Sequence, residues 1–409
     1  MSGEQFVDIA TEEVRRSSAP LVDFNHLDSR PRDDQYALGA SFRKNSPIVF
    51  SNAHGGIFYV CSYDLVKQIV LDPDNFSNID GVSVPGHKFD FPVLSSQADP
   101  PDHHKYRNAM QEFLRPTAIK KHQDLVRKII NEAIDPLLAK KGGDVIADFA
   151  IHVPLRVAAA VLGYSESETT RLHHSFSSML EGSLVHDDVK KKAGMDAFLA
   201  ILFEAYSRAL ANSNDQTMLG RLAHYSQDGQ SFSQEEILGM MAGLTIGAID
   251  TTKHSITNTI YLLAKWPEAH QELLNDRSLI PAAVEESLRL ESVAYFIART
   301  VKNPVTLGGI DLKPGDRLVM SNGWANRDET AFEDPMKFDL HRKRNYHFGF
   351  GHGVHSCLGV HLARMELAIA LEVMLEKMPR YELVNPIPDP KSFGSVVYGF
   401  EYLNIRILD

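Results

Sequence analysis

The chain has 409 residues, of which 44% are hydrophobic and 23% are charged. This is the composition of a globular protein with enough apolar material for a large core, and it excludes an intrinsically disordered chain. The formal net charge of −11 argues against sequence-independent binding to nucleic acid, because such binding needs clustered Lys and Arg opposite the phosphates. Small molecules and proteins remain as candidate partners.

The N-terminal segment predicts where the protein is located in the cell, and the lack of linkers along the chain predicts the number of domains. Met1 to Arg16 mixes acidic residues, arginine and serine, and it holds no apolar run long enough for a signal peptide or a membrane anchor. We therefore expect a cytoplasmic protein that does not attach to a membrane. No Pro/Gly/Ser-rich linker, repeat or low-complexity tract interrupts the chain, so we expect one domain over residues 1–409.

Strand signals lie near the two ends of the chain, and helical patterns fill the middle. Ile48 to Phe50 and Ile57 to Cys61 predict a hairpin, and Gly399 to Leu408 alternates apolar and polar residues. Apolar residues recur at helical spacing in Ile129 to Leu138, Val153 to Leu162, Met195 to Leu210 and Leu222 to Tyr225. The expected fold class is mainly α with small β-sheets (α+β).

One predicted helix is unusually long. Ser233 and Glu236 form a capping box, and no proline follows until Trp266-Pro267, which gives a helix on the order of 48 Å at 1.5 Å per residue. Its middle contains Gly247, Asp250 and Thr251, residue types that add little helix stability.

Two interpretations of this segment stay open. In the first, Gly247 permits close helix packing and Asp250 faces water. In the second, Thr251 bonds back to the carbonyl of Gly247, opens the helix locally, and leaves a groove for a small ligand with Asp250 beside it as a proton source.

A glycine-rich segment near the C-terminus contains one of the only two cysteines, Cys61 and Cys357, which are too few for a disulfide framework. It reads Phe350-Gly351-His352-Gly353-Val354-His355-Ser356-Cys357-Leu358-Gly359. Here the chain resembles the cytochrome P450 superfamily, whose ligand loop is Phe-Gly-x-Gly-x-(Arg or His)-x-Cys-x-Gly. Every specified position is filled, and the resemblance extends from about Asp33 to Asp409. It implies the cytochrome P450 fold, with the haem between the long helix and the cysteine loop.

Physical chemistry agrees with this loop as a ligand segment. The glycines let the backbone turn under a flat macrocycle, and the helix that starts after Cys357 directs its positive end at the sulfur. The resemblance makes Cys357 the axial ligand of haem b, with Phe350, Gly351 and Gly359 beside the cofactor. A buried small residue, or a zinc site with His352 and His355, is the alternative.

Further matches to the family imply roles for charged residues. Glu286 and Arg289 match its Glu-x-x-Arg pair, and Arg342 looks like the third member of that structural network. Four cations are implied to meet the haem propionates, namely His103, Arg107, Arg299 and His355.

The resemblance also implies a mechanism and a pocket. Asp250 and Thr251 are the acid-alcohol pair that handles dioxygen and its protons, with Asp250 drawing protons from solvent, and Ala248 lies beside the haem. The substrate pocket is expected to include Leu244, Val293, Phe296, Val397 and Tyr398. The walls also include 82–94 and 179–185, and His186 or Tyr398 is a candidate to orient a polar group, although core packing is the simpler role for each. A small hydrophobic substrate such as a terpenoid, steroid-like or aromatic compound follows by analogy.

Electrons are expected from a separate ferredoxin or flavodoxin with its reductase, since no flavin- or iron–sulfur-binding segment is recognisable. Basic residues near the cysteine side of the haem are candidates to steer that donor, namely Lys105, Arg107, Lys343, Arg344 and Arg364. Three rival functions remain: a haem-based gas sensor, a peroxide-driven enzyme, and oxidative coupling or ring closure without oxygen insertion. The acid-alcohol pair speaks against the sensor, because sensing needs no proton delivery.

Overall fold

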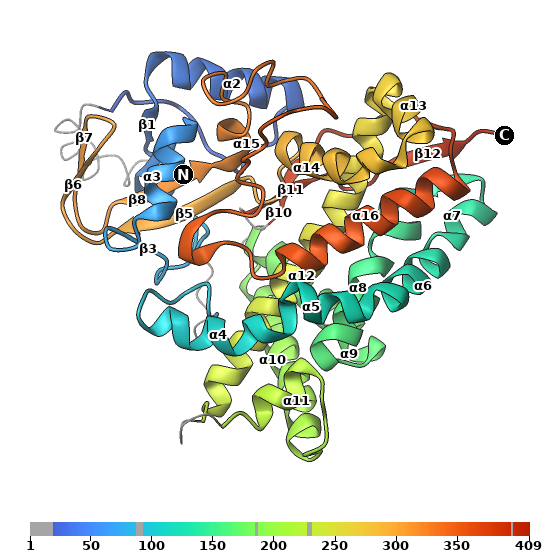
Figure 1. Cartoon of the computed structure of the whole chain (residues 1–409). Coiled ribbons are helices and arrows are strands. Elements are labelled where there is room, and N and C mark those ends of the chain that lie inside the picture. The colour runs from blue at the N-terminus through green and yellow to red at the C-terminus, as the bar shows by residue number, and fades with distance from the viewer. Residues whose placement is uncertain (1–18, 87–92, 185–186, 227–230, 394–395) are drawn as a thin grey trace.

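The structure is a computed structural model that describes residues 19–86, 93–184, 187–226, 231–393 and 396–409. Helices form one side of the molecule, and a five-stranded sheet with short helices forms the other (Figure 1). The longest helix, α12, runs through the middle, and α16 lies in front of it in this view. The expected α+β class is therefore confirmed.

The α-helices of the described residues follow each other in chain order as α2 Arg32–Asn45, α3 Tyr63–Leu71, α4 Asp102–Leu114, α5 Pro116–Ile119, α6 Gln123–Ala133, α7 Asp135–Ala139, α8 His152–Ala158, α9 Glu166–Leu184, α10 Asp188–Leu210, α11 Met218–Ala223, α12 Gln234–Lys265, α13 Pro267–Asn275, α14 Ile280–Leu290, α15 Asn322–Ala325 and α16 Val360–Lys377. The strands are β1 Ile48–Ser51, β2 Ile57–Val60, β3 Phe76–Ser77, β4 Gly142–Asp144, β5 Phe296–Val301, β6 Val305–Leu307, β7 Ile310–Leu312, β8 Arg317–Ser321, β9 Tyr381–Leu383, β10 Lys391–Phe393, β11 Val397–Gly399 and β12 Asn404–Ile407.

The main sheet has the order β1-β2-β8-β5-β3. Only the β2–β8 pair is parallel, with Tyr59 opposite Val319, whereas β5 runs antiparallel to β8 with Ala298 opposite Val319. Successive side chains of a strand point to opposite faces. Tyr59, Phe296, Ala298 and Val319 therefore pack in one apolar cluster, and their neighbours along the strands pack on the other face.

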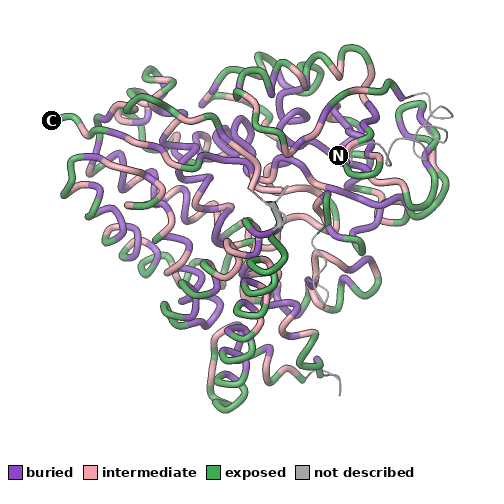
Figure 2. The backbone as a smooth tube through the Cα atoms, turned by 180° about the vertical axis from the view of Figure 1, so that it is seen from behind, coloured by how far each residue is buried: buried purple, intermediate pink, exposed green. Residues whose placement is uncertain are grey.

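The helices bury a separate and larger apolar core. The inner turns of the helices are buried and the outer turns are exposed, as Figure 2 shows. The segment Ile146–Gly163 is long and apolar enough to cross a membrane, but 56% of it is buried inside the molecule. The segment is therefore apolar because it belongs to the core.

Most predicted elements are present, with four changes of boundary. The helix expected over Leu222 to Tyr225 is the end of α11, which stops at Ala223. The hairpin of β1 and β2 and the capping box at Ser233 are confirmed. The single helix expected over Ile129 to Leu138 is two helices, α6 and α7, because Pro136 lacks the N–H that a continuous helix needs there. Where one helix was expected over Val153 to Leu162, α8 ends at Ala158 and the chain continues as a π-helical turn. The strand expected over Gly399 to Leu408 is divided, since β11 pairs with β10 while β12 pairs with β4 and β9.

Candidate active site

A cavity of about 380 Å³ lies between α12, the main sheet and the loop that precedes α16. Its wall is mostly apolar, and charged side chains gather at one part of it. Of the residues predicted to surround a cofactor, the following line this cavity: His103, Arg107, Ala248, Arg299, Phe350, Gly351, His355, Cys357 and Gly359. The segments that supply them extend from His103 to Gly359 in the chain, and the fold brings them together.

The loop that carries Cys357 is shaped by glycine and by backbone hydrogen bonds. Gly351 and Gly353 have φ angles of 62° and 71°, which an L side chain rarely adopts. A Cβ atom on Gly353 would lie 2.2 Å from the carbonyl oxygen of Val70, so this position also needs glycine for space. The Cys357 N–H donates to the Phe350 carbonyl at 2.8 Å and closes the loop.

The surroundings of the Cys357 thiol suit it to bind a metal ion. Burial raises the pKa of this thiol, while the N–H of Gly359 and the charge of Arg107 oppose the rise. The sulfur is thus protonated in isolation, and a metal ion that replaces the proton would find the thiolate already supported by a donor. Within the described residues, no group of three His, Cys, Asp or Glu side chains could hold a metal ion, which weighs against the zinc alternative.

Within the described residues, none of the four side chains expected around the cofactor has an acidic side chain in ion-pair contact, although the charge of Asp99 acts on His103, Arg299 and His355. His103 is fully buried and neither ring nitrogen has a hydrogen-bond partner, and Nε2 of His355 is also unpaired. Burial lowers the pKa of His103 to about 4, of His355 to about 3 and of Arg299 to about 10. Arg107 donates to the carbonyl of Ser356 at 2.8 Å.

This arrangement fits a haem. Buried donors that face a cavity without partners carry a desolvation cost, which an anion from outside the chain would offset. The two propionates of a haem are such anions, and the sulfur of Cys357 lines the same cavity. His103, Arg107, Arg299 and His355 are the residues that would hold the propionates, and Cys357 would hold the iron.

The middle of α12 contributes Gly247 and Thr251 to the cavity wall. The Thr251 hydroxyl donates to the Gly247 carbonyl at 2.6 Å, as the sequence predicts. The predicted local opening of the helix is wrong, because α12 is continuous from Gln234 to Lys265. A Cβ atom on Gly247 would meet no atom within 4 Å outside the adjoining backbone of α12, so the missing side chain itself provides the groove.

Asp250 lies on a different side of α12 from the cavity. It is buried, and its Oδ1 lies 2.7 Å from Nζ of Lys253 and 3.4 Å from Nε2 of His173 on α9. Burial alone would raise the pKa of Asp250, but His173 and Lys253 hold the pKa well below its ordinary value. The interpretation in which Asp250 faces water is therefore wrong.

The predicted pocket wall is correct only in part. Leu244 and Val293 line the cavity, but Phe296, Val397 and Tyr398 are not among its lining residues. Phe296 and Tyr398 instead pack in an apolar cluster on the other face of the sheet. Alternation along β5 explains the error at Phe296, since the next residue, Ile297, points into the cavity. Val82 and Leu94 line it as expected, whereas residues 87–92 and His186 lie outside the described part of the chain.

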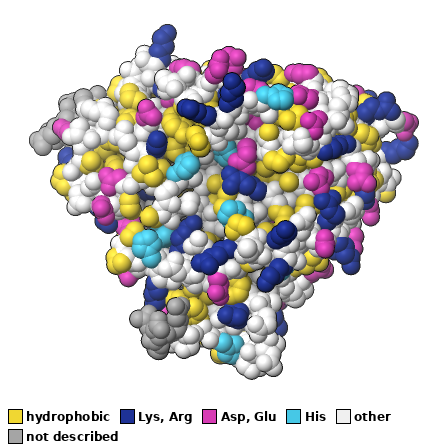
Figure 3. Space-filling view, viewed as in Figure 1, with side chains coloured by type: hydrophobic (Ala, Val, Ile, Leu, Met, Phe, Trp, Pro, Cys, Tyr) yellow, Lys and Arg dark blue, Asp and Glu magenta, His cyan; other side chains and the backbone are white. Residues whose placement is uncertain are grey.

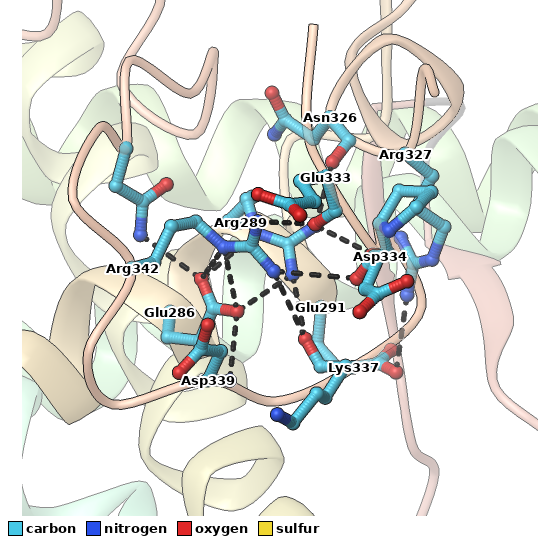
Figure 4. A network of polar contacts seen from close by, with 12 residues as sticks. Glu286, Arg289, Glu291, Asn326, Arg327, Glu333, Asp334, Lys337, Asp339 and Arg342 are labelled. Atoms are coloured by element: carbon cyan, nitrogen blue, oxygen red, sulfur yellow. Dashed lines mark hydrogen bonds and ion pairs between the residues drawn. The ribbon is translucent and has the colours of Figure 1, made fainter. Parts of the chain in front are cut away.

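The predicted structural network exists and is almost entirely buried (Figure 4). Arg289 donates to Glu286 from two nitrogens at 2.8 and 2.7 Å, and Arg342 donates to Glu286 at 3.1 Å. Arg289 also donates to the carbonyls of Asn326 and Pro335. The network thus ties α14 to the segment that leads into the cysteine loop.

Three residues at the site were missed from the sequence. Asn78 is buried on the cavity wall with its Oδ1 unpaired, and Glu366 on α16 is buried there with Oε2 unpaired. The third is His173, the partner of Asp250. Glu366 follows Cys357 by nine residues on an apolar helix, and this isolated acid was the only available signal. Asn78 and His173 carried none, because their positions depend on the tertiary fold.

Comparison with known proteins agrees with this geometry. The family model described as Cytochrome P450 matches residues 165–386, more than half of the chain. The chain belongs to the cytochrome P450 family. It is therefore a P450 monooxygenase with a haem-thiolate iron cofactor, and its reaction takes dioxygen, a substrate and a redox partner.

Individual P450s match along most of the chain. The putative cytochrome P450 YjiB of Bacillus subtilis (strain 168) is 28% identical over 373 residues, which are 90% of this chain and 92% of that protein. The mycinamicin IV hydroxylase/epoxidase of Micromonospora griseorubida is 32% identical over 291 residues, covering 70% of this chain and 73% of that protein. The crystal structure of CYP109E1 from Bacillus megaterium in complex with testosterone superposes with a TM-score of 0.83 at 26% identity, over 92% of this chain and 98% of that one.

Proposed function

We propose that this P450 binds haem b through Cys357 and hydroxylates a small hydrophobic substrate with two electrons from a separate redox partner. The observation that carries the proposal is the meeting at one cavity of the Cys357 sulfur, Arg107, Arg299 and two histidines with unpaired ring nitrogens, His103 and His355. When bound, the haem-thiolate iron supplies the reductive activation of dioxygen. The remaining tasks fall to side chains of this chain.

Binding and orientation of the cofactor are assigned to two groups. His103, Arg107, Arg299 and His355 would neutralise the propionates, and Phe350, Gly351, Gly359 and Ala248 shape the walls beside the ring. Glu286, Arg289 and Arg342 are assigned a structural role, because none of them lines the cavity. Since the lining residues run from Val70 to Glu366, we also propose that residues 1–409 form one domain.

Proton handling is assigned to Thr251 and Asp250. The Thr251 hydroxyl lines the cavity, and its hydrogen bond to Gly247 fixes where its oxygen points. That oxygen can accept or pass a proton beside the reacting centre. Asp250 precedes Thr251 on α12 and is ionised, and its buried pairing with Lys253 makes it an indirect rather than a solvent-exposed proton source.

The cavity favours an apolar substrate. Val82, Leu94, Leu244, Val293 and Ile297 are among its apolar lining residues. A terpenoid, a steroid-like or an aromatic compound fits such a wall, and the similar CYP109E1 was crystallised with testosterone. A screen of these three classes for a shift of the Soret band tests the preference for an apolar substrate. A result in which only charged compounds bind would contradict that preference.

The redox partner is proposed to be a ferredoxin or flavodoxin that acts with its reductase in the cytoplasm. Lys and Arg side chains gather over α4, α5 and the start of α16 on the face that carries the cysteine loop (Figure 3). Lys343 and Arg344 are exposed and precede the cysteine loop in the chain. Lys105 and Arg364 contribute less net charge, since they pair with Glu236 and Glu285 at 2.6 Å.

Charge reversal tests this docking face. Lys343→Glu together with Arg344→Glu should slow reduction by an acidic donor at low salt, and the difference should shrink as salt is added. Arg380→Glu is the matched control, because Arg380 is also exposed but lies beyond the far end of α16, about 27 Å along that helix. Equal reduction rates and equal salt dependence in all three proteins would contradict the docking face.

One comparison separates the main proposal from its rivals. Product formation with dioxygen, a reductase system and electrons should exceed product formation with peroxide alone, and the product should contain one oxygen atom from dioxygen. A product that lacks this atom would favour coupling or ring closure. Ligand binding without turnover on any compound that shifts the Soret band would favour a sensor.

A further inference from the structure

Glu285 on α14 binds two side chains that lie beside the cysteine loop. Arg364 on α16 donates from Nε and Nη2 to the two oxygens of the Glu285 carboxylate, at 2.6 and 2.7 Å. Such two-pronged contacts fix the geometry of both groups. Nε2 of His347 lies 3.1 Å from Oε2 of the same carboxylate. One acid therefore joins α14 to the start of α16 and to the segment that leads into the loop.

His347 extends this restraint to the backbone of the loop. The N–H of Gly349 donates to Nδ1 of His347 at 3.0 Å, so Nδ1 accepts and the ring proton lies on Nε2. Nε2 therefore donates to Glu285. Gly349 immediately precedes Phe350, whose carbonyl accepts the N–H of Cys357 at 2.8 Å. The start of the cysteine loop is thus held through the imidazole by the Glu285 carboxylate.

Arg364 brings a positive charge close to the sulfur that would hold the iron. The guanidinium carbon lies 4.9 Å from the centre of the Phe350 ring. Burial raises the pKa of the Cys357 thiol, and the charge of Arg364 is one of the effects that oppose this rise. The charge of Arg364 therefore reaches the sulfur, and the Glu285 carboxylate offsets it.

Glu285 carries its negative charge near neutral pH. Burial alone would raise the pKa of the Glu285 carboxyl, but the hydrogen bonds from His347 and Arg364 lower this pKa to about 2. The next residue, Glu286, is fully buried and binds Arg289 instead. The two adjacent acids of α14 therefore have separate partners, and Glu285 is the one that faces the loop and the start of α16.

We propose that Glu285 is a positioning residue that sets the reduction potential of the haem iron by offsetting the charge of Arg364 near the Cys357 sulfur. This inference rests on the proposed ligation of the iron by Cys357. Reduction adds one negative charge at the iron, so an uncompensated cation nearby favours the reduced state and an uncompensated anion disfavours it. Glu285 therefore makes the iron harder to reduce than it would be beside Arg364 alone.

Removal of each partner should shift the potential in opposite directions. Glu285→Gln keeps the shape of the side chain, leaves Arg364 uncompensated, and should raise the equilibrium constant for one-electron reduction on the order of tenfold at low salt. A tenfold change corresponds to about 59 mV for one electron. Arg364→Met leaves the carboxylate uncompensated and should lower the potential. The double variant lacks both charges and should return close to the wild-type value.

Two further variants separate the effect of charge from damage to the structure. Arg364→Lys keeps the positive charge and should stay close to the wild-type potential. Glu372→Gln removes an acid that pairs with Arg127 about 12 Å further along α16, and it should leave the potential unchanged. Titration of the purified holoenzyme with small-molecule redox mediators measures each potential without turnover and without a protein partner.

The signs of the shifts decide the outcome. Opposite shifts that cancel in the double variant support the inference, whereas shifts of the same sign, or none, in both single variants would overturn it. The ferrous-carbonyl band of wild type near about 450 nm tests the ligation by Cys357 separately. If this band is present and the potentials do not respond, only the role of Glu285 fails. If the band is absent, the ligation by Cys357 fails and the inference fails with it.

Discussion

Thr251 donates its hydroxyl hydrogen to the carbonyl of Gly247, one turn earlier on α12, at 2.6 Å. Both residues face the cavity, and the helix remains continuous through them. The hydrogen bond therefore orients the hydroxyl oxygen toward the cavity without any break in the backbone. Two predictions depend on this pair.

Thr251→Ala should retain the haem and bind substrate, but it should divert electrons from product to peroxide, because the oriented hydroxyl is lost. The loss in coupling should be on the order of tenfold or more. The ratio of product and peroxide formed to electrons consumed measures it. Thr251→Ser keeps the hydroxyl and should recover much of the coupling, and normal coupling in Thr251→Ala would contradict the assigned role.

Gly247→Ala should change both the stability of α12 and the size of the cavity, and the two effects can be measured separately. Alanine should raise the free energy of unfolding by about 0.5–1 kcal/mol, because glycine is a poor helix former. The new methyl group would enter open space in the cavity, since no atom outside the adjoining backbone of α12 lies within 4 Å of it. Large ligands should therefore bind more weakly while small ones are little affected. Unchanged affinity for a steroid-sized ligand would show that the substrate lies elsewhere.

The buried pair of Glu286 and Arg289 predicts a large loss of stability on removal of one partner. Arg289→Met leaves the Glu286 carboxylate buried with fewer donors, and the expected cost is about 3–5 kcal/mol in the free energy of unfolding. Chemical denaturation of the holoenzyme measures this. Arg171→Met removes an exposed ion pair with Glu204 and should have a much smaller effect. Equal effects of the two substitutions would contradict the structural role of the buried network.

Glu366 gives a pH dependence whose sign follows from its burial. Burial raises the pKa of this carboxyl to about 8, so the folded protein holds the proton more tightly than the unfolded chain does. Its contribution to stability is full below the unfolded pKa near 4.5 and is lost as pH rises toward 8. Between these limits the free energy of unfolding should fall by about 1.4 kcal/mol per pH unit on account of this group.

Glu366→Gln removes that ionisation and keeps the shape of the side chain. The variant should match wild type near pH 4.5 and become the more stable protein as pH approaches 8, as measured by denaturation at several pH values. Parallel stability curves for the two proteins would mean that Glu366 finds a charged partner in the folded holoenzyme.

The sequence allowed the prediction of features that depend on local chemistry. The cysteine loop needs glycine at Gly353, the capping box starts α12 at Ser233, and Thr251 reaches back to Gly247 within one helical turn. Each of these involves residues that are near one another in the chain or a backbone conformation that few residues adopt. The meeting of His103, Arg107, Arg299 and His355 at one cavity was also predictable, but only through the resemblance to the family.

The errors concern the direction in which a residue faces. Phe296 and Ile297 are both apolar, so the pattern of β5 could not show which of them meets the cavity. In one of two interpretations Asp250 faced water, and only the docking of α9 on α12 shows that His173 lies beside it. Tyr398 was assigned to the pocket, but its strand turns it toward Tyr295, with the ring centroids 4.8 Å apart. Such facts follow from tertiary packing between distant segments.

The carbonyl complex of the reduced holoenzyme tests the central assignment, the bond between the Cys357 sulfur and the iron, most directly. Wild type should absorb near about 450 nm, as expected for thiolate ligation, and Cys357→His should lose this band. Cys61→Ser is the matched control, because Cys61 is fully buried at the end of β2 and does not line the cavity, so the band should remain. Absence of the band in wild type, or its persistence in Cys357→His, would contradict the assignment of Cys357.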